Sequence, residues 1–295
     1  VVVDWEDDTS VRMSAAQLYD LVFEGNNKWM LSANGTIFTY EYEAIIPGLL
    51  KRWYEERQEM QRKMRECGDN EIEREYWDKR QLVKKINLNS LYGAILNPGC
   101  RFFDIRIGQS VTLTGRCITK HMASKVNEIV TGEYDHKGES IVYGDTDSVY
   151  FSAYKTLQKE IKDGLIPWTK DSVVGLYDKI SEEVNSSFKS FMTKAFHTPA
   201  TRGEVIAAGR ELVASKGLFI TKKRYALLYY DKEGKRTDVD GKEGKMKAMG
   251  LDLKRSDTPV FVQDFLSEIL YMVLSGNEEK KVLDRISEFR AEFKA

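Results

Sequence analysis

The sequence predicts an α+β fold in which long helices pack with antiparallel strands. Apolar residues recur at helical spacing over four long segments, and two shorter runs rich in Val, Ile, Tyr and Phe alternate as strands do. Turn signals separate these segments. The predicted helices cover residues 47–65, 71–94, 108–131 and 172–195, with helix again from 259 onward, and the predicted strands lie in 140–152 and 204–232.

Length and composition narrow the possible classes of protein. The chain has 295 residues, of which 31% are charged, and a formal net charge of −1. A nucleic-acid-binding surface would therefore have to come from local clustering of cations. No run of about 18 apolar residues is present, so we expect no membrane span. The three cysteines have no C-x-x-C spacing, which argues against a disulfide framework or a zinc site.

Both ends of the sequence suggest a piece of a longer protein. The first residues, VVVDWEDDTS, contain no initiating Met and no signal-peptide pattern, and the last residues form a charged helical pattern without a stop. We expect an internal fragment of a longer polypeptide, or one piece of a split protein.

The first third of the chain predicts short strands followed by a pair of helices. Residues 14–24 have a helical pattern, and residues 28–42 indicate strands around a central turn. A helix from near Pro47 to about Arg65 ends at a Cys-Gly turn, and Asn70 is a plausible N-cap for the next helix. Because the connection is so short, the two helices should fold back as an antiparallel pair.

The stretch SIVYGDTDSVYFS, residues 140–152, predicts a hairpin that presents two carboxylates at its turn. Gly144-Asp145 between two strand-like runs is a hairpin signal, and Asp145 and Asp147 are spaced i, i+2. Carboxylates held so close repel each other unless a cation neutralises them. Mg²⁺ prefers such hard oxygen ligands together with substrate phosphates. The alternative is an exposed hairpin whose aspartates simply favour the turn.

The second predicted helix carries a polar face next to a glycine. Lys85, Asn89 and Tyr92 are spaced i, i+4, i+7 and so share one side of the helix, with Gly93 directly after the tyrosine. A cation, an amide and an aromatic ring could contact a triphosphate, a sugar and a base. The alternative is a solvated face with the tyrosine in the core.

A basic cluster precedes the last apolar run of the predicted strands. Lys222, Lys223, Arg224 and Tyr225 stand before Ala226 and four large apolar residues. Strand alternation predicts Lys223 and Tyr225 on one face, with Lys222 and Arg224 on the other. The alternative is a charged strand end in solvent.

Three strings together resemble family B DNA-directed DNA polymerases, of the replicative type found in tailed phages. YGDTDS is similar to the palm metal motif, K-x-x-x-N-S-x-Y-G at 85–93 is similar to the fingers motif that binds the incoming dNTP, and KKRYA is similar to the element that holds the primer–template. The first two occur in the family's order, about fifty residues apart, and CRFFD at 100–104 adds support.

The resemblance implies a fold and a division of the chain. The fold is a polymerase palm, an antiparallel sheet with packed helices, joined to an antiparallel two-helix fingers hairpin. The expected segments are 1–46 on the palm side, 47–96 as the fingers helices, 97–260 as the palm with the metal hairpin and the primer–template contacts, and 261–295 as a helix leading to a thumb.

The resemblance also implies a two-metal transfer of a nucleotide from a dNTP to the primer 3′-OH. Asp147 would be the principal ligand of two Mg²⁺ ions, Asp145 an auxiliary ligand and Glu204 an accessory palm carboxylate. Arg57 and Lys85 would bind the triphosphate, and Tyr92 would pack against the nascent base pair with Asn89 beside it. Expected DNA contacts are Lys222, Lys223, Arg224, Tyr225, Lys247, Lys254 and Arg255.

The sequence departs from the family in two places. Gln61 stands where the family often has a lysine, four residues after Arg57, and the D-x-x-S-L-Y-P-S string with a further aspartate is absent. We therefore expect the isolated chain to be inactive in nucleotide addition. A non-catalytic, nucleic-acid-binding subunit that resembles a polymerase is the alternative.

The implied partners are primer–template DNA, dNTPs and the remainder of the polymerase, with a sliding clamp as a further candidate. No membrane is expected among them. The expected location is the cytoplasm, that of the host cell if a phage encodes the protein.

Overall fold

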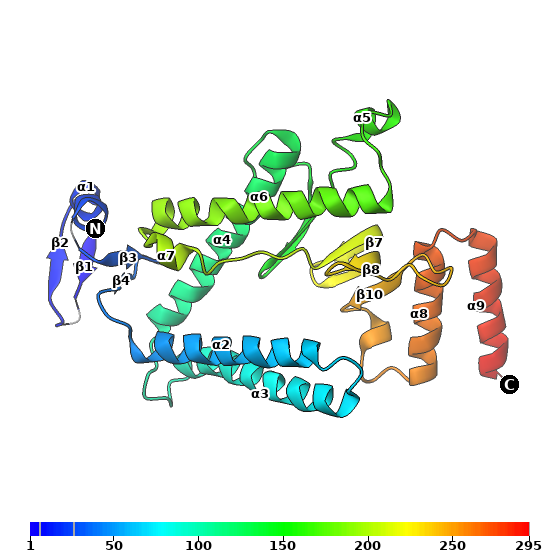
Figure 1. Ribbon diagram of the computed structural model, residues 1–295, viewed down its shortest axis with the longest axis horizontal. Coiled ribbons are helices and arrows are strands. Elements are labelled where there is room, and N and C mark those ends of the chain that lie inside the picture. Colours follow the sequence, from blue (N-terminus) through cyan, green and yellow to red (C-terminus); the bar gives the residue numbers. More distant parts are fainter. Residues whose placement is uncertain (6, 26, 295) are drawn as a thin grey trace. The chain divides into compact units, whose positions relative to one another are not determined.

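The computed structural model describes residues 1–5, 7–25 and 27–294. The chain forms two compact units (Figure 1): unit 1 comprises Val1–Ile118 and Lys189–Val205, and unit 2 comprises Thr119–Phe188 and Ile206–Ala295. Helices α4 (Ile105–Thr131) and α6 (Lys170–Phe196) contribute to both units. Every pairing between described strands is antiparallel, which confirms the predicted α+β class.

Unit 1 begins with short hairpins and a short helix. Strands β1 (Val2–Asp4) and β2 (Ser10–Arg12) pair, and α1 (Ala15–Tyr19) follows. Ser14 and the side chain of the third helical residue form a capping box that fixes the start of α1. The helix predicted for residues 14–24 exists, but its second half, η1 (Asp20–Glu24), is π-helical. The predicted strands around the turn at 33–35 are also present, as β3 (Trp29–Leu31) and β4 (Ile37–Thr39).

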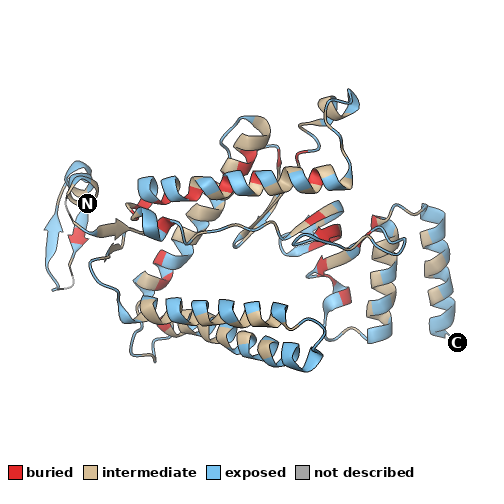
Figure 2. Cartoon of the chain, in the orientation of Figure 1, coloured by how far each residue is buried: buried red, intermediate tan, exposed pale blue. Residues whose placement is uncertain are grey.

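The predicted pair of antiparallel helices in unit 1 is confirmed. Helix α2 (Ile45–Glu66) begins two residues before Pro47, which lies in its first turn, and α3 (Glu71–Ile95) follows after a short connection. Asn70 caps α3 as expected, because its side chain accepts a 3.2 Å hydrogen bond from the Glu73 amide. The two helices pack side by side (Figure 1). No residue of α2 is buried (Figure 2), so this helix is supported mainly by α3.

Unit 2 contains two sets of strands. Strands β5 (Ile141–Asp145) and β6 (Ser148–Phe151) form one hairpin. The other sheet has the order β10-β8-β7, and β9 also pairs with β8. Its strands are β7 (Leu212–Thr221), β8 (Arg224–Lys232), β9 (Lys235–Arg236) and β10 (Lys245–Met249). The prediction that strand begins near residue 204 is wrong, since residues 204–211 contain none.

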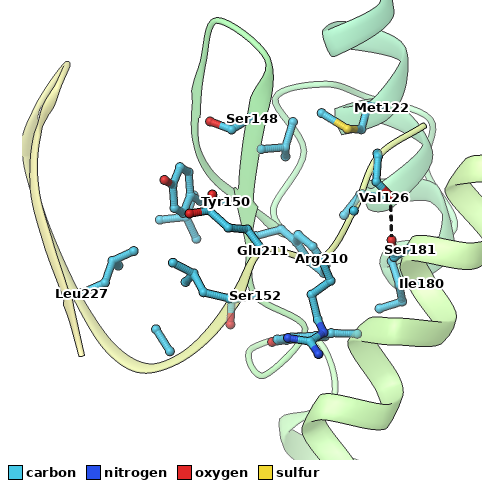
Figure 3. Close-up of a pocket in the computed structure, with 18 of the residues that line it drawn as sticks. Met122, Val126, Ser148, Tyr150, Ser152, Ile180, Ser181, Arg210, Glu211 and Leu227 are labelled. Carbon is cyan, nitrogen blue, oxygen red and sulfur yellow. Dashed lines mark hydrogen bonds between the residues drawn. The ribbon is translucent and has the colours of Figure 1, made fainter. Parts of the chain in front are cut away.

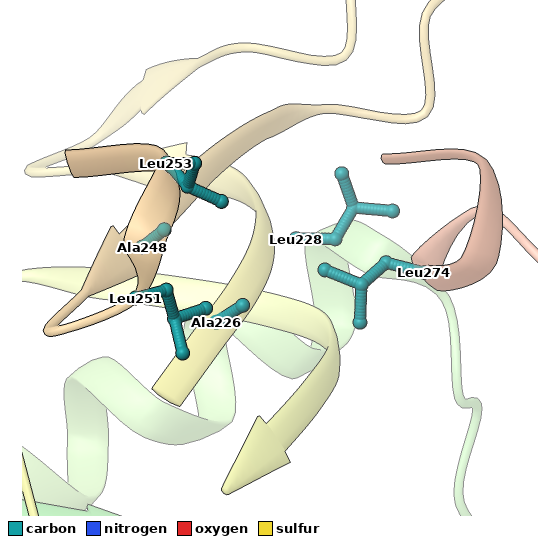
Figure 4. Close-up of a cluster of buried hydrophobic side chains, with 6 residues drawn as sticks. All are labelled: Ala226, Leu228, Ala248, Leu251, Leu253 and Leu274. Atoms are coloured by element: carbon teal, nitrogen blue, oxygen red, sulfur yellow. The ribbon is translucent and has the colours of Figure 1, made fainter. Parts of the chain in front are cut away.

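A hydrophobic cluster of unit 2 is built on the central strand β8 (Figure 4). Because β8 lies between β7 and β10, its residues 225–228 are all buried, which is why the sequence there is a continuous apolar run. Leu274, at the end of α8 (Val260–Leu274), closes the cluster. The buried members are Ala226, Leu228, Ala248, Leu251, Leu253 and Leu274.

The remaining helices are short or peripheral. They are α5 (Gln158–Lys162), α7 (Ala200–Gly203), the 3₁₀ turn η2 (Asp252–Lys254) and α9 (Glu279–Lys294). Helix α9 packs against α8 and has no buried residue among those described (Figure 2). None of the helices in the described ranges is long and apolar enough to cross a membrane.

Candidate active site

The two predicted metal ligands lie at the end of the β5–β6 hairpin in unit 2. Asp145 is the last residue of β5 and pairs with Ser148, so the connection is the two-residue turn Thr146-Asp147, which we call the carboxylate turn. Thr146 has a positive φ of 50°, a conformation that two-residue hairpins require. Asp147 is exposed in the turn, whereas the Asp145 side chain is 24% exposed. The strand thus continues through Gly144 and Asp145, two residues further than the sequence suggested.

Helix α4 fixes the backbone of the carboxylate turn. The Thr119 hydroxyl, on the part of α4 that belongs to unit 2, donates a 3.0 Å hydrogen bond to the carbonyl oxygen of Thr146. Ser148 adds a 3.1 Å hydrogen bond to the carbonyl oxygen of Asp145. These bonds hold both carboxylates on an ordered backbone, which is the preorganisation that a metal site needs.

Lys222 and Lys223 form a second two-residue turn, which we call the basic turn. Thr221 of β7 pairs with Arg224 of β8, so the two lysines connect the strands and do not lie within one. The expected alternation of Lys222 and Lys223 across a strand is therefore wrong. Lys223 has φ 62°, and a residue in a turn does not follow the period of two that governs strands.

Four aromatic rings join the β5–β6 hairpin to the β7–β8 hairpin. Tyr143 lies opposite Tyr150 in one hairpin, and Phe219 lies opposite Tyr225 in the other. The centroids of all ring pairs, within and between hairpins, are 5.4–5.7 Å apart. Such pairs stabilise beyond the area that they bury. We call these four residues the aromatic cluster.

Two hydrogen bonds complete the connection between the hairpins. The Lys223 amide donates to the Tyr143 hydroxyl at 2.8 Å, and the hydroxyls of Tyr150 and Tyr225 are also 2.8 Å apart. Burial, followed by the contact with Tyr150, raises the pKa of Tyr225, so its hydroxyl stays neutral. The structure therefore brings Lys223 near the carboxylates, with Lys223 Nζ 4.0 Å from an Asp145 carboxylate oxygen.

The sequence did not predict that aromatic residues hold the two hairpins together. Tyr143, Tyr150 and Phe219 were predicted only as strand residues. The signal available was the spacing in β5, where Tyr143 is two residues before Asp145, so that the ring and the carboxylate share a face. Phe219 gave no such signal, because the pairing register of β7 with β8 shifts between Phe219 and Thr221.

The remaining predicted DNA contacts lie on three elements of unit 2: Arg224 begins β8, Lys247 is on β10, and Lys254 and Arg255 are at the end of η2. Arg224 Nε donates a 3.2 Å hydrogen bond to the carbonyl oxygen of Gly250, and Lys254 is exposed on η2. Two cations have carboxylate partners. Lys247 Nζ is 2.8 Å from Glu211, and Arg255 makes a two-point contact with Asp257 at 2.6 and 2.8 Å.

A cavity of about 560 Å³ lies along β6 in unit 2 (Figure 3). Residues 148–151 of β6, Ser152 directly after it and residues 207–212 leading into β7 line the cavity. The Ser181 hydroxyl of α6 bonds the Ala208 carbonyl oxygen at 3.0 Å on the α6 side. Asp147 also lines the cavity, so the cavity opens next to the carboxylate turn.

In unit 1, the predicted dNTP-binding face lies on α3. Lys85 and Asn89 are exposed, and Tyr92 is partly buried, with its hydroxyl donating a 3.3 Å hydrogen bond to the Gly108 carbonyl oxygen. The tyrosine is therefore anchored while the other two side chains are accessible. A Cβ built on Gly93 would meet no atom within 4 Å, so the backbone there is open to an approaching group.

Arg57 and the cations near it are already engaged. Arg57 Nε donates a 3.2 Å hydrogen bond to the Gln81 side chain across the helix pair. Arg62 contacts Glu59 and Glu66 at 2.6 and 2.8 Å, and these hydrogen bonds raise its pKa. Lys63 lies 4.6 Å over the ring of Trp77. Arg62 and Lys63, the cations that follow Gln61, are therefore both engaged within the helix pair.

Glu204 follows α7 in unit 1 and forms a 2.5 Å ion pair with Lys189. Within the described residues, no group of three His, Cys, Asp or Glu side chains could hold a metal ion. The carboxylates of Asp145 and Asp147 suit a hard divalent cation, which would need further oxygen ligands from a substrate or another polypeptide.

Comparison with known proteins identifies the family of this chain. Residues 6–197 and 200–294 match the family model described as DNA polymerase family B. The chain is 34% identical over 210 residues to the DNA-directed DNA polymerase of Escherichia phage RB69, covering 67% of this chain and 22% of that protein. It is 30% identical over 226 residues to the same enzyme of Enterobacteria phage T4, covering 72% and 24%.

A more distant relative is DNA polymerase 1 of Pyrococcus abyssi, 26% identical over 257 residues, with 86% of this chain and 27% of that protein covered. The chain thus spans about a quarter of the length of these relatives. With the family model matching nearly its whole length, the chain belongs to DNA polymerase family B.

Proposed function

We propose that this chain supplies part of the active site for DNA-templated DNA synthesis, in which a nucleotide passes from a dNTP to the primer 3′-OH. One observation carries the proposal: in a chain of this family, Asp145 lies on an ordered hairpin beside Lys223 of the basic turn. A carboxylate pair can bind metal ions while an adjacent cation binds a phosphate of the DNA backbone.

Asp147 is the proposed principal metal ligand because it is exposed in the turn, and Asp145 is the second. Glu204 is the proposed accessory carboxylate, which would have to leave Lys189 to act as one. Two Mg²⁺ ions bound by such ligands would supply charge stabilisation for the attacking and leaving oxygens.

For the incoming dNTP we propose the exposed face of α3. Lys85 would contact the triphosphate, and the anchored ring of Tyr92 would pack against the nascent base pair, with Asn89 between them. Arg57 uses one N–H for Gln81, so its other guanidinium donors remain for a phosphate.

For primer–template DNA we propose the basic turn and the cations near it. Lys222, Lys223 and Lys254 are exposed, whereas Lys247 and Arg255 must exchange their carboxylate partners for phosphates. The other proposed partners are the remainder of the polymerase and a sliding clamp. The proposed location is the cytoplasm, that of the host cell if a phage encodes the protein.

Further polymerase segments are proposed to complete the metal site. The cavity beside β6 opens next to Asp147, and β6 pairs with β5 alone among the described strands. An added strand from those segments could therefore bring another carboxylate to the turn. We accordingly propose that the isolated chain is inactive.

Primer extension tests the proposal. We expect no extension by the chain alone, and extension once the remaining polymerase segments are supplied in trans. Asp147→Ala should abolish that activity, while Asp163→Ala, an exposed aspartate outside the site, should preserve it. Duplex binding without extension in the complete mixture would instead support a non-catalytic subunit, and extension by the chain alone would contradict the proposed inactivity.

A further inference from the structure

Tyr143 connects the carboxylate turn to the basic turn. It precedes Asp145 by two residues on β5, and its hydroxyl accepts the 2.8 Å hydrogen bond from the Lys223 amide. Its ring also contacts Phe219 and Tyr225 of the other hairpin, each with centroids 5.6 Å away. The position of the Lys223 backbone is therefore set by a residue of the strand that carries Asp145.

The Lys223 backbone is held from its other side as well. The carbonyl oxygen of Lys223 lies so close to Gly250 that a Cβ on this glycine would be 2.1 Å away. With its N–H bound to Tyr143 and its carbonyl oxygen against Gly250, Lys223 has little freedom in the backbone. Its side chain is different: it is 64% exposed and extends to 4.0 Å from Asp145.

The Lys223 ammonium therefore has two alternative anionic partners. In this structure its nearest carboxylate is that of Asp145, which the proposed function assigns to a metal ion. A divalent cation on Asp145 repels the ammonium and replaces it as the counter-charge. A DNA phosphate attracts the same ammonium away from the carboxylate.

We propose, resting on the function proposed above, that Lys223 couples metal binding to DNA binding, with Tyr143 as the positioning residue that keeps it within reach of both. A metal ion on Asp145 releases Lys223 for the duplex, and a bound duplex releases Asp145 for the metal ion. Because coupling between binding sites is reciprocal, each ligand tightens the binding of the other by the same factor.

DNA affinity with and without Mg²⁺ tests this coupling on the chain itself. The dissociation constant of a fluorescently labelled primer–template duplex is measured by anisotropy at matched ionic strength, and the ratio of the two constants is compared between variants. We expect Mg²⁺ to tighten binding by the wild-type chain about fivefold. The ratio should fall towards one in Lys223→Gln and in Asp145→Asn. Any effect of Mg²⁺ on the duplex itself is the same for all variants, so it does not change the ranking of the variants by this ratio.

Lys222→Gln is the matched control for the charge. Lys222 is the exposed neighbour in the same turn, so its loss should weaken binding in both conditions and leave the ratio at the wild-type value. Tyr143→Phe keeps the ring and removes only the acceptor of the Lys223 amide. It should reduce the ratio, while Tyr154→Phe, at an exposed tyrosine outside the aromatic cluster, should not.

The outcomes separate this inference from the proposed function. Duplex binding with the same ratio in wild type, Lys223→Gln and Lys222→Gln would overturn the coupling and leave the proposed function intact. Failure of the wild-type chain to bind the duplex would overturn the DNA contacts proposed for this chain, and the coupling with them.

Discussion

The hydroxyl groups of Tyr150 and Tyr225 share a 2.8 Å hydrogen bond between β6 and β8. Tyr225 is only 5% exposed, so its hydroxyl has little access to water and depends on this partner. The bond therefore holds the hairpin that carries Asp145 against the strand that begins next to Lys223. The geometry of the candidate site depends on this contact, and the Tyr225 ring, which the sequence predicts as a DNA contact, is buried in it.

Tyr225→Phe should lower the free energy of unfolding of the chain by about 1 kcal/mol, because it leaves the Tyr150 hydroxyl without this partner. Tyr150→Phe in the same chain should then cost less than it does alone, since both ends of the bond are already gone. Urea unfolding of the four variants of this cycle measures the coupling. Additive effects of the two substitutions would contradict the prediction.

The local part of the site is predictable from sequence because its signals lie within a few residues. Gly144-Asp145 between alternating strands predicts the hairpin with Asp147 in its turn, and it is present. Asn70 before a helical pattern predicts an N-cap, and it is one. Such features depend on local backbone geometry, which neighbouring residues largely determine.

The basic turn is not predictable in the same way. Lysine is not among the residue types that favour turns. In addition, Lys223 adopts a left-handed backbone conformation, which residues other than glycine rarely adopt. The conformation is supported by Tyr143, which is 80 residues away in sequence, and by Gly250. Contacts between residues so far apart leave no periodic pattern in the sequence. The sequence therefore predicted that Lys222 and Lys223 continue a strand.

The segment before β7 shows the same limit. Its apolar residues 205–208 favour strand, yet the chain there stays irregular and brings Arg210 to two carboxylates, Asp178 and Asp231. Asp231 lies on β8 and Asp178 on α6, so the tertiary contact determines the path of the segment. The strand propensity of these residues therefore influences the path of the segment less than the need to pair the buried charges does.

Arg210→Met should destabilise the chain strongly. Arg210 is 11% exposed and its Nη1 lies 2.6 Å from the carboxylate of Asp231, which is 2% exposed. Removing the guanidinium leaves a buried carboxylate without its cation, which typically costs about 3 kcal/mol or more. Thermal or urea unfolding followed by circular dichroism measures the loss.

Lys79→Met is the control for Arg210→Met, because the pair between Lys79 and Glu75 on α3 is exposed on both sides. Exposed ion pairs contribute little to stability, so the unfolding free energy of this variant should stay close to that of the wild type. Equal losses in the two variants would show that Asp231 does not depend on Arg210.

The free energy of unfolding of the chain should decrease as the pH is lowered, because of His121. Burial of this histidine lowers its pKa from the usual value near 6.5, and its ring nitrogens contact the hydroxyls of Tyr134 at 2.7 Å and Ser187 at 2.9 Å. Below about pH 6.5 the unfolded chain therefore binds a proton that the folded chain does not, which favours unfolding. Above that pH both states are neutral and the contribution is constant.

His121→Gln tests this contribution, because glutamine offers hydrogen-bonding groups but does not titrate. The melting temperature of the wild-type chain should drop more steeply than that of the variant as the pH falls below about 6.5. The other two histidines are the same in both proteins, so they cancel in the comparison. Parallel profiles would show that His121 does not contribute.

Gly250→Ala should distort the basic turn. Gly250 has φ +62°, and the new Cβ would be 2.1 Å from the carbonyl oxygen of Lys223, so one of the two backbones must move. Gly234→Ala is the matched control: it has φ +80° in the turn before β9, but its Cβ would meet no atom within 4 Å. Both variants experience the backbone strain, and only the first experiences the clash.

The difference between the two glycine variants therefore measures the contact with Lys223. We expect Gly250→Ala to lose at least about 1 kcal/mol more unfolding free energy than Gly234→Ala in urea. It should also bind a labelled primer–template duplex more weakly, because the displaced carbonyl oxygen moves Lys223. Equal unfolding free energies and equal duplex affinities would mean that the basic turn does not depend on Gly250.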